Sequence, residues 1–153
     1  MGIVEREAAS ARDLLSRVEE IEEVARTLDA NDERRQQLEE VVVRILRAAP
    51  PLRAGVAAQL LSLSERTVRA WAAEGVLRAA DSTSTRLLLD PERFHEVLHL
   101  VRDLREAGKT TGLLDEVYRR LVDATWLERS DLTESLAQMR RREGRVPRPK
   151  AAG

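Results

Sequence analysis

The sequence predicts a mainly α-helical fold that contains one small β element, and three observations favour this class. Apolar residues recur at steps of three and four along several segments, which is the spacing of one helix face. Residues 78–89 lack that spacing and join a polar stretch to three consecutive leucines, which indicates extended chain. Pro50-Pro51 marks the clearest boundary, because proline lacks an amide hydrogen and restricts the residue before it.

The chain divides into four expected parts. We expect a helical arm at 1–49, a compact module at 50–110, further helices at 111–143 and a disordered basic tail at 144–153. The net charge of −1 hides a gradient, since residues 1–50 carry 12 acidic and 8 basic side chains while residues 51–110 carry 8 and 9. A module this close to neutral would bind a polyanion only modestly unless dimerisation doubled its contacts.

The helical arm is predicted to contain two helices. The first covers about residues 4–28, and Asn31 or Asp32 is placed to cap a second helix that reaches roughly Ala48. The first helix carries an apolar seam with acidic residues on its other faces, which is typical of helix pairing. The seam has two interpretations, packing on its own domain or an interface with a second copy or a partner. The candidate dimerisation residues are Leu14, Val18, Ile21 and Leu28, and a long helix expected from Pro91 to Ala107 is the alternative dimerisation element.

Two short helices, about 54–61 and 64–74, are predicted after the prolines with a tight turn between them. Ser64 fits the N-cap of the second helix, because its side-chain oxygen can accept a hydrogen bond from an amide in the first turn. Gly75 fits the position that ends that helix. A further helix is expected to begin at Asp90-Pro91 and to end at Gly108, with an apolar face of Phe94, Val97, Leu98, Val101 and Leu104.

The second short helix is predicted to have an apolar inner face and a polar outer face. Val68 and Trp71 lie three positions apart and should point inward. Arg66, Thr67 and Arg69 then point outward. Arginine can bind guanine edges in pairs of hydrogen bonds or hold phosphates, and threonine can contact a phosphate or a thymine methyl group. This face is therefore predicted to meet the groove of double-stranded DNA.

The run Ser-Glu-Arg-Thr-Val-Arg-Ala-Trp at 64–71, with the ending Gly75-Val76-Leu77, resembles the winged helix-turn-helix of excisionases and MerR-type regulators. The resemblance implies that the helix beginning at the serine enters the major groove and that residues 78–89 form the wing. About fifty residues of helix precede the motif, and the chain has neither the metal-binding cysteines nor the ligand domain of MerR regulators. The resemblance therefore implies DNA binding but not metal or drug sensing. It assigns DNA contact to Ser64, Arg66, Thr67, Arg69 and Arg86.

These features predict a sequence-specific, DNA-binding transcriptional regulator that acts as a homodimer without a cofactor. The alternative is an antitoxin that represses its own operon and neutralises a toxin partner through its appended helices. The chain has no apolar stretch of about eighteen residues, and its charged start does not resemble a secretory signal. We therefore expect no membrane association and a cytoplasmic, nucleoid-associated location.

Neither a catalytic set nor a metal site is predicted. The absence of cysteine excludes thiolate ligands and a cysteine nucleophile. His95 and His99 lie one helical turn apart, and Asp103 lies a further turn along, which is a spacing that can present ligands on one face. The sequence shows no third strong ligand beside the two histidines. Glu19, Glu20, Glu22 and Glu23 are expected to form a solvated acidic face with no histidine or metal motif nearby. We therefore expect no metal site and no enzymatic activity.

Overall fold

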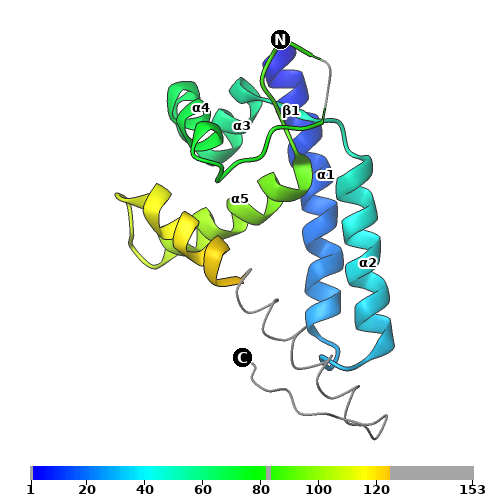
Figure 1. Ribbon diagram of the computed structural model, residues 1–153. Coiled ribbons are helices and arrows are strands. Elements are labelled where there is room, and N and C mark those ends of the chain that lie inside the picture. The colour runs from blue at the N-terminus through cyan, green and yellow to red at the C-terminus, as the bar shows by residue number, and fades with distance from the viewer. Residues whose placement is uncertain (1, 82–83, 125–153) are drawn as a thin grey trace, which may run out of the picture. The chain divides into compact units, whose positions relative to one another are not determined.

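The computed structural model describes residues 2–81 and 84–124 (Figure 1). It is mainly α-helical with a small two-stranded antiparallel sheet, which confirms the predicted class at that level. Residues Met1–Leu114 form one compact unit, and a second unit begins at Asp115. Within the described part of the chain, no helix is long and apolar enough to cross a lipid bilayer.

The C-terminal predictions are covered only in part. Residues 113–124 are helical, as expected for the start of the C-terminal helices. The remaining predicted helix and the predicted basic tail at 144–153 lie outside the residues that the structure describes.

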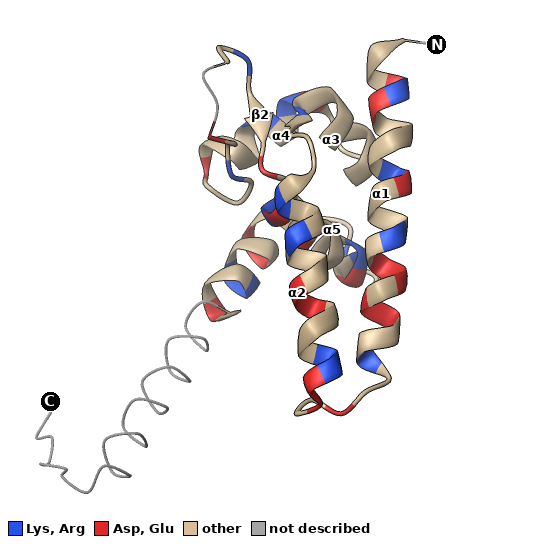
Figure 2. Cartoon of the chain, turned by 90° about the vertical axis from the view of Figure 1, so that its right-hand side faces the viewer, with Lys and Arg blue, Asp and Glu red and all other residues tan. Residues whose placement is uncertain are grey.

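The first two helices, α1 (Ile3–Arg26) and α2 (Glu33–Ala48), lie side by side as a hairpin (Figures 1 and 2). Asp32 begins α2, because its carboxylate accepts a hydrogen bond from the amide of Arg34 at 2.9 Å. The Asp32 cap was one of the two predicted. Acidic and basic residues are interspersed along both helices in Figure 2.

The apolar seam of α1 packs within its own chain. Val18 is completely buried, whereas the other three seam residues keep part of their surface in solvent. Helix α1 contacts α2 and the helix that follows the prolines, so the predicted arm and the predicted module belong to one compact unit. For Val18 the structure therefore shows packing on the chain's own fold. Contact between two copies through Leu14, Ile21 and Leu28 stays a prediction.

Two short helices, α3 (Ala54–Leu61) and α4 (Glu65–Ala73), follow with a three-residue turn between them. Ser62 adopts the left-handed conformation with φ 55°, which turns the chain sharply after α3. The amide of Leu63 then bonds to the carbonyl of Ala58 at 3.0 Å. Most side chains of α3 are buried, so α3 is the inner support on which α4 rests.

The last labelled helix, α5 (Pro91–Glu106), begins as predicted. The Asp90 carboxylate accepts a hydrogen bond from the amide of Arg93 at 3.3 Å. All five residues of the predicted apolar face are buried. At the far end of α5, the Arg105 guanidinium donates to the Leu61 carbonyl at 2.6 Å. This bond ties α5 to the turn between α3 and α4.

A small two-stranded sheet joins the segment before α3 to the segment before α5. Strand β1 (Leu52–Arg53) pairs antiparallel with β2 (Leu88–Leu89), and Leu52 lies opposite Leu89. The other edge of β2 meets the chain that leaves α4, since the amide of Ala80 bonds to the Leu88 carbonyl at 2.8 Å. The two ends of the predicted extended segment are therefore paired with each other. Strand β1 was not predicted.

Candidate nucleic-acid interface

The start and end of α4 are both fixed by local interactions. The Ser64 hydroxyl accepts a hydrogen bond from the Thr67 amide at 3.1 Å and lies 2.8 Å from the Thr67 hydroxyl. At the other end Gly75 has a φ of +84°, a conformation that glycine adopts without steric cost. The cap and the stop predicted for this helix are therefore confirmed.

The two faces of α4 differ as the sequence predicts. Val68 is completely buried and Trp71 is 4% exposed, so both side chains belong to the core. Arg66 and Arg69 are exposed, and Thr67 is half-buried beside the cap. Because an apolar inner face is held against the protein, the outer face is presented to solvent at a fixed angle. Four of the predicted contact residues, Ser64, Arg66, Thr67 and Arg69, therefore share this one short helix.

The two arginines of α4 differ in their partners. Arg69 forms an exposed ion pair with Glu65 one turn earlier, at 2.9 Å. Exposed pairs of this kind contribute about 0.3–0.5 kcal/mol, so a phosphate or a base edge can displace Glu65 at little cost. Arg66 has no hydrogen-bond or ion-pair partner among the residues that the structure describes. Its guanidinium is therefore free to bind a group outside the chain.

The β-hairpin at 78–90, between α4 and α5, carries the remaining predicted contact. Arg86 is exposed, and its backbone amide bonds to the Ser84 hydroxyl at 3.1 Å. Arg78 lies 3.7 Å from the Asp90 carboxylate, which links the two ends of the hairpin. Residues 82–83, at the tip, are outside the described part of the chain. Arg86 thus lies on a separate element from the four residues of α4.

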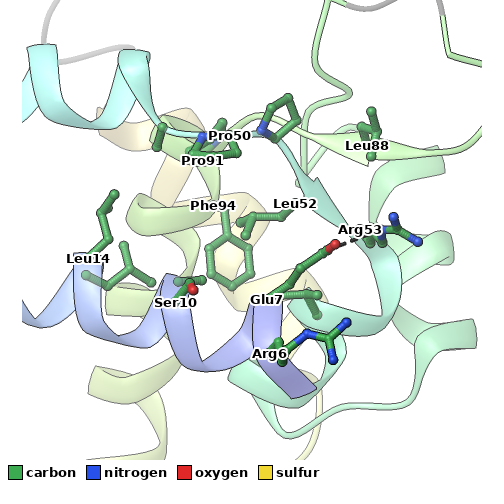
Figure 3. A pocket seen from close by; sticks show the side chains of 15 residues that line it. Arg6, Glu7, Ser10, Leu14, Pro50, Leu52, Arg53, Leu88, Pro91 and Phe94 are labelled. Carbon is green, nitrogen blue, oxygen red and sulfur yellow. Dashed lines mark ion pairs between the residues drawn. The ribbon is translucent and has the colours of Figure 1, made fainter. Parts of the chain in front are cut away.

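A cavity of about 690 Å³ lies where α1, β1 and α5 meet, and no sequence pattern predicted it (Figure 3). Leu14, Leu52 and Phe94 form part of its apolar wall. At one side the Arg53 guanidinium pairs with the Glu7 carboxylate at 3.1 Å. Leu14, one of the predicted dimerisation residues, therefore faces a hollow within the compact unit.

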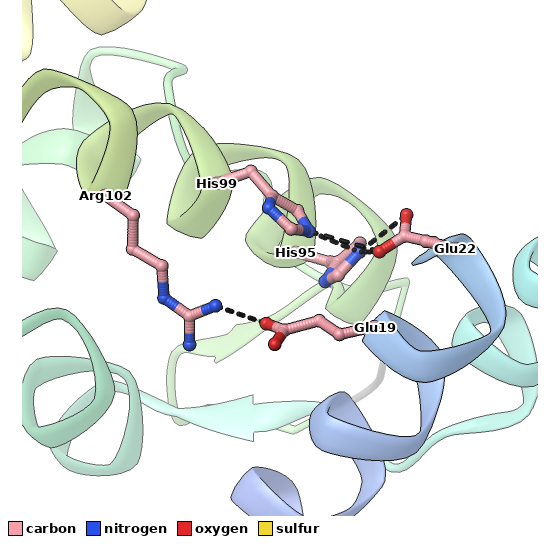
Figure 4. Close-up of polar contacts among 5 residues, drawn as sticks. All are labelled: Glu19, Glu22, His95, His99 and Arg102. Atoms are coloured by element: carbon pink, nitrogen blue, oxygen red, sulfur yellow. Dashed lines mark hydrogen bonds and ion pairs between the residues drawn. The ribbon is translucent and has the colours of Figure 1, made fainter. Parts of the chain in front are cut away.

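The structure also brings Glu22 against the two histidines, which corrects the expectation that Glu22 belongs to a solvated acidic face with no histidine nearby. Glu22 of α1 lies against His95 and His99 of α5 (Figure 4). Its Oε1 atom is 3.0 Å from His95 Nε2 and 3.2 Å from His99 Nε2. Seventy-three positions separate Glu22 from His95, so no spacing in the sequence could show the contact. Asp103, the third residue that the helical spacing suggested, is exposed on α5 and is not part of this cluster.

The electrostatics of this cluster depend on the same contacts. Burial raises the pKa of Glu22, but the hydrogen bonds and charges of the two imidazoles outweigh it and lower the pKa from 4.5 to about 2. The hydrogen bond to Glu22 raises the pKa of His99, against the effect of its own burial. Beside them Arg102 pairs with Glu19, as Figure 4 shows.

Comparison of this chain with protein-family models finds no match. Comparisons with curated proteins and with solved structures also find none. What the chain does must therefore be inferred from its own residues.

Proposed function

We propose that the chain is a sequence-specific, DNA-binding transcriptional regulator and that residues 52–90 act as a winged helix-turn-helix. In this proposal α3, the turn at 62–64 and α4 supply the helix pair, and α4 enters the major groove. The paired hairpin between α4 and α5 is the wing. The observation that carries the proposal is Arg66, an exposed guanidinium on a rigidly supported helix with no partner among the described residues.

The chemistry of the α4 face suits a duplex. Arg66 and Arg69 can each donate two hydrogen bonds to the O6 and N7 atoms of guanine, or hold a phosphate. Ser64 and Thr67 lie at the start of the helix, where hydroxyl groups commonly reach the phosphate backbone. Arg86 on the hairpin provides a further cation for the backbone or the minor groove.

A homodimer is part of the proposal because one module carries little net charge. The whole chain has a formal charge of −1, so a single copy gains little from long-range attraction to DNA. Two copies would double the phosphate contacts and read paired half-sites. Leu14, Ile21 and Leu28, which are only partly covered within the chain, are the proposed contact residues.

The test is selection of bound sequences from random duplex DNA with the full chain, followed by a salt titration on the selected duplex. An enriched inverted or direct repeat, with affinity that falls steeply as salt rises, is expected. Arg66→Ala and Arg69→Ala should each weaken binding by about 1–3 kcal/mol and leave the melting temperature nearly unchanged.

Arg17→Ala is the matched control for Arg69→Ala. Arg17 is an exposed arginine on α1 that pairs with Asp13 one turn earlier at 2.8 Å, just as Arg69 pairs with Glu65. Its loss should leave DNA affinity unchanged. Absence of enrichment, or wild-type affinity in both α4 variants, would overturn the proposal and make protein binding the next class to test.

A further inference from the structure

The three side chains between α1 and α5 place their polar atoms at nearly equal distances. Glu22 Oε1 is 3.0 Å from His95 Nε2 and 3.2 Å from His99 Nε2, and the two Nε2 atoms are 3.1 Å apart. The ring planes are inclined at 83°, so the two imidazoles meet edge to face and do not stack. The three atoms therefore form an almost equilateral triangle.

Hydrogen bonds alone do not account for all three sides of this triangle. Each Nε2 carries at most one hydrogen, and an ionised carboxylate carries none. If both imidazoles donate to Glu22, two N–H groups face each other across the 3.1 Å contact between the rings. If one imidazole lacks the hydrogen on Nε2, the lone pair of that nitrogen faces the negatively charged carboxylate, which is also unfavourable. A cation among the three atoms makes every one of these contacts favourable.

The size of the triangle matches the coordination distances of zinc. Zinc binds imidazole nitrogen at about 2.0–2.1 Å and carboxylate oxygen at about 2.0–2.2 Å, so two ligand atoms of a tetrahedral site lie about 3.3 Å apart. The observed sides of 3.0–3.2 Å are close to that value. An ion about 1 Å above the plane of the triangle reaches all three atoms at these bond lengths.

We propose that Glu22, His95 and His99 bind a divalent transition-metal ion, for which Zn²⁺ is the best fit. Two imidazoles with one carboxylate favour Zn²⁺ over Mg²⁺ and Ca²⁺, which prefer oxygen ligands alone. The side chains of Glu22 and His99 are 27% and 34% exposed, which leaves an entry path and a fourth position for water. The buried His95, at 6%, forms the floor of the site.

Such an ion would link α1 directly to α5. The ligands come from two helices that are far apart in the chain, so binding should stabilise the compact unit. The His95 Nδ1 atom has no hydrogen-bond partner among the described residues. A metal-binding histidine usually donates that N–H to an acceptor, and losing such an acceptor weakens binding by about 10- to 100-fold. We therefore expect weaker affinity than at a site whose histidines each have such an acceptor.

The test uses the full chain without a histidine tag, stripped of metal with a chelator. Titration calorimetry with Zn²⁺ should show that one ion binds per chain. Thermal unfolding with Zn²⁺ present should give a higher melting temperature than without it. Glu22→Gln and His99→Gln should each weaken binding at least about tenfold. Asp103→Asn is the control. It changes an exposed carboxylate one turn beyond His99 on α5, outside the cluster, and should bind as the wild type does.

Co²⁺ gives a second, spectroscopic measurement that does not depend on any variant. Bound Co²⁺ should show the intense visible absorption of four-coordinate nitrogen and oxygen ligation. A wild-type chain that binds no Zn²⁺, a Co²⁺ spectrum like that of the ion in water, or variants that bind as tightly as the wild type would each overturn the proposal. Because no DNA is present, these results are independent of the proposed function.

Discussion

The outer face of α4 and the contact between α1 and α5 both gather charged side chains, but they arrange them in opposite ways. On α4 the charges are exposed, and the one ion pair joins two residues of the same helix at 2.9 Å. Between α1 and α5 the polar atoms converge from two helices, and each lies within 3.2 Å of the others. The first surface faces outward, whereas the second joins parts of the fold.

This difference separates residues that we propose for recognition from residues that serve stability. An exposed ion pair contributes between zero and about 1 kcal/mol, so the α4 face can change without loss of the fold. A partly buried cluster is different, because removing one member takes a hydrogen-bond partner from the others, at a cost of about 1–3 kcal/mol. The two surfaces should therefore respond differently to substitution and to pH.

The largest expected effect comes from the inner face of α4. Trp71→Ala removes a side chain that is 4% exposed and should lower the free energy of unfolding by about 3–5 kcal/mol. Urea denaturation measures this loss. Arg69→Ala on the outer face of the same helix is the control, with an expected change within about 0.5 kcal/mol. Similar losses in the two variants would show that the faces do not divide as described.

The contact between α1 and α5 should make stability depend on pH. Despite burial, which raises it, the pKa of Glu22 is lowered from 4.5 to about 2, so its contribution is complete above pH 4.5 and is lost as pH falls toward 2. The pKa of His99 is raised, so its contribution is complete below pH 6.5 and is lost as pH rises through the raised pKa. Nearby, Glu19 adds to the increase and Arg102 opposes it.

Urea denaturation of the metal-free chain, with chelator present, measures this dependence. The wild type and Glu22→Gln should differ most between pH 4.5 and 6.5, by on the order of 1–2 kcal/mol, and less on either side. Asp103→Asn, an exposed carboxylate on α5, should show no such window. A difference for Glu22→Gln that is the same at every pH would contradict the pairing.

A smaller effect is expected at Ser64, the N-cap of α4. Ser64→Ala removes the acceptor for the Thr67 amide and should lower the free energy of unfolding by about 1 kcal/mol. Ser64→Asp keeps an acceptor at the N-cap and is the matched control. Thermal or urea unfolding measures both variants. Equal loss in the two would mean that the hydrogen bond does not provide the stabilisation.

The smallest expected effect concerns the acidic residue on the outer face. Glu65→Gln releases Arg69 from its ion pair and removes a negative charge next to the proposed DNA surface. It should strengthen DNA binding by less than about 1 kcal/mol and change stability by a few tenths of a kcal/mol. Binding to the selected duplex at low salt measures the gain. Weaker binding would show that Glu65 itself contributes to recognition.

Local chemistry made most of the helices predictable. The caps at Ser64 and Asp90 and the stop at Gly75 were predicted because each depends on residues within a few positions. The buried face of α5 was predicted because apolar periodicity reports which side is covered. Two residues are too few to show the alternation of a strand, so β1 at Leu52–Arg53 was missed.

Contacts between distant segments were not predictable in the same way. The apolar stripe of α1 is satisfied equally by the chain's own helices or by a second copy, so sequence alone left Val18 with two interpretations. His95 and His99 were noticed through their spacing, whereas Glu22 was expected on a solvated acidic face with no histidine nearby. The structure contradicts that expectation for Glu22. Its role depends on how α1 packs on the rest of the unit, which only the structure provides. Of the proposed DNA surface, the exposure of Arg66 and Arg69 was predicted correctly, whereas Thr67 is half-buried, and the contact of this face with DNA stays a prediction.

The pairing of β1 with β2 has a consequence for whether this segment can be transferred between proteins. Leu52 lies opposite Leu89, and such antiparallel partners have Cα atoms about 5 Å apart. A segment whose two ends lie close together can be inserted into another polypeptide without distorting the residues on either side of the insertion. Residues 52–89 meet that geometric condition, with Pro50-Pro51 immediately before them and the N-cap of α5 immediately after.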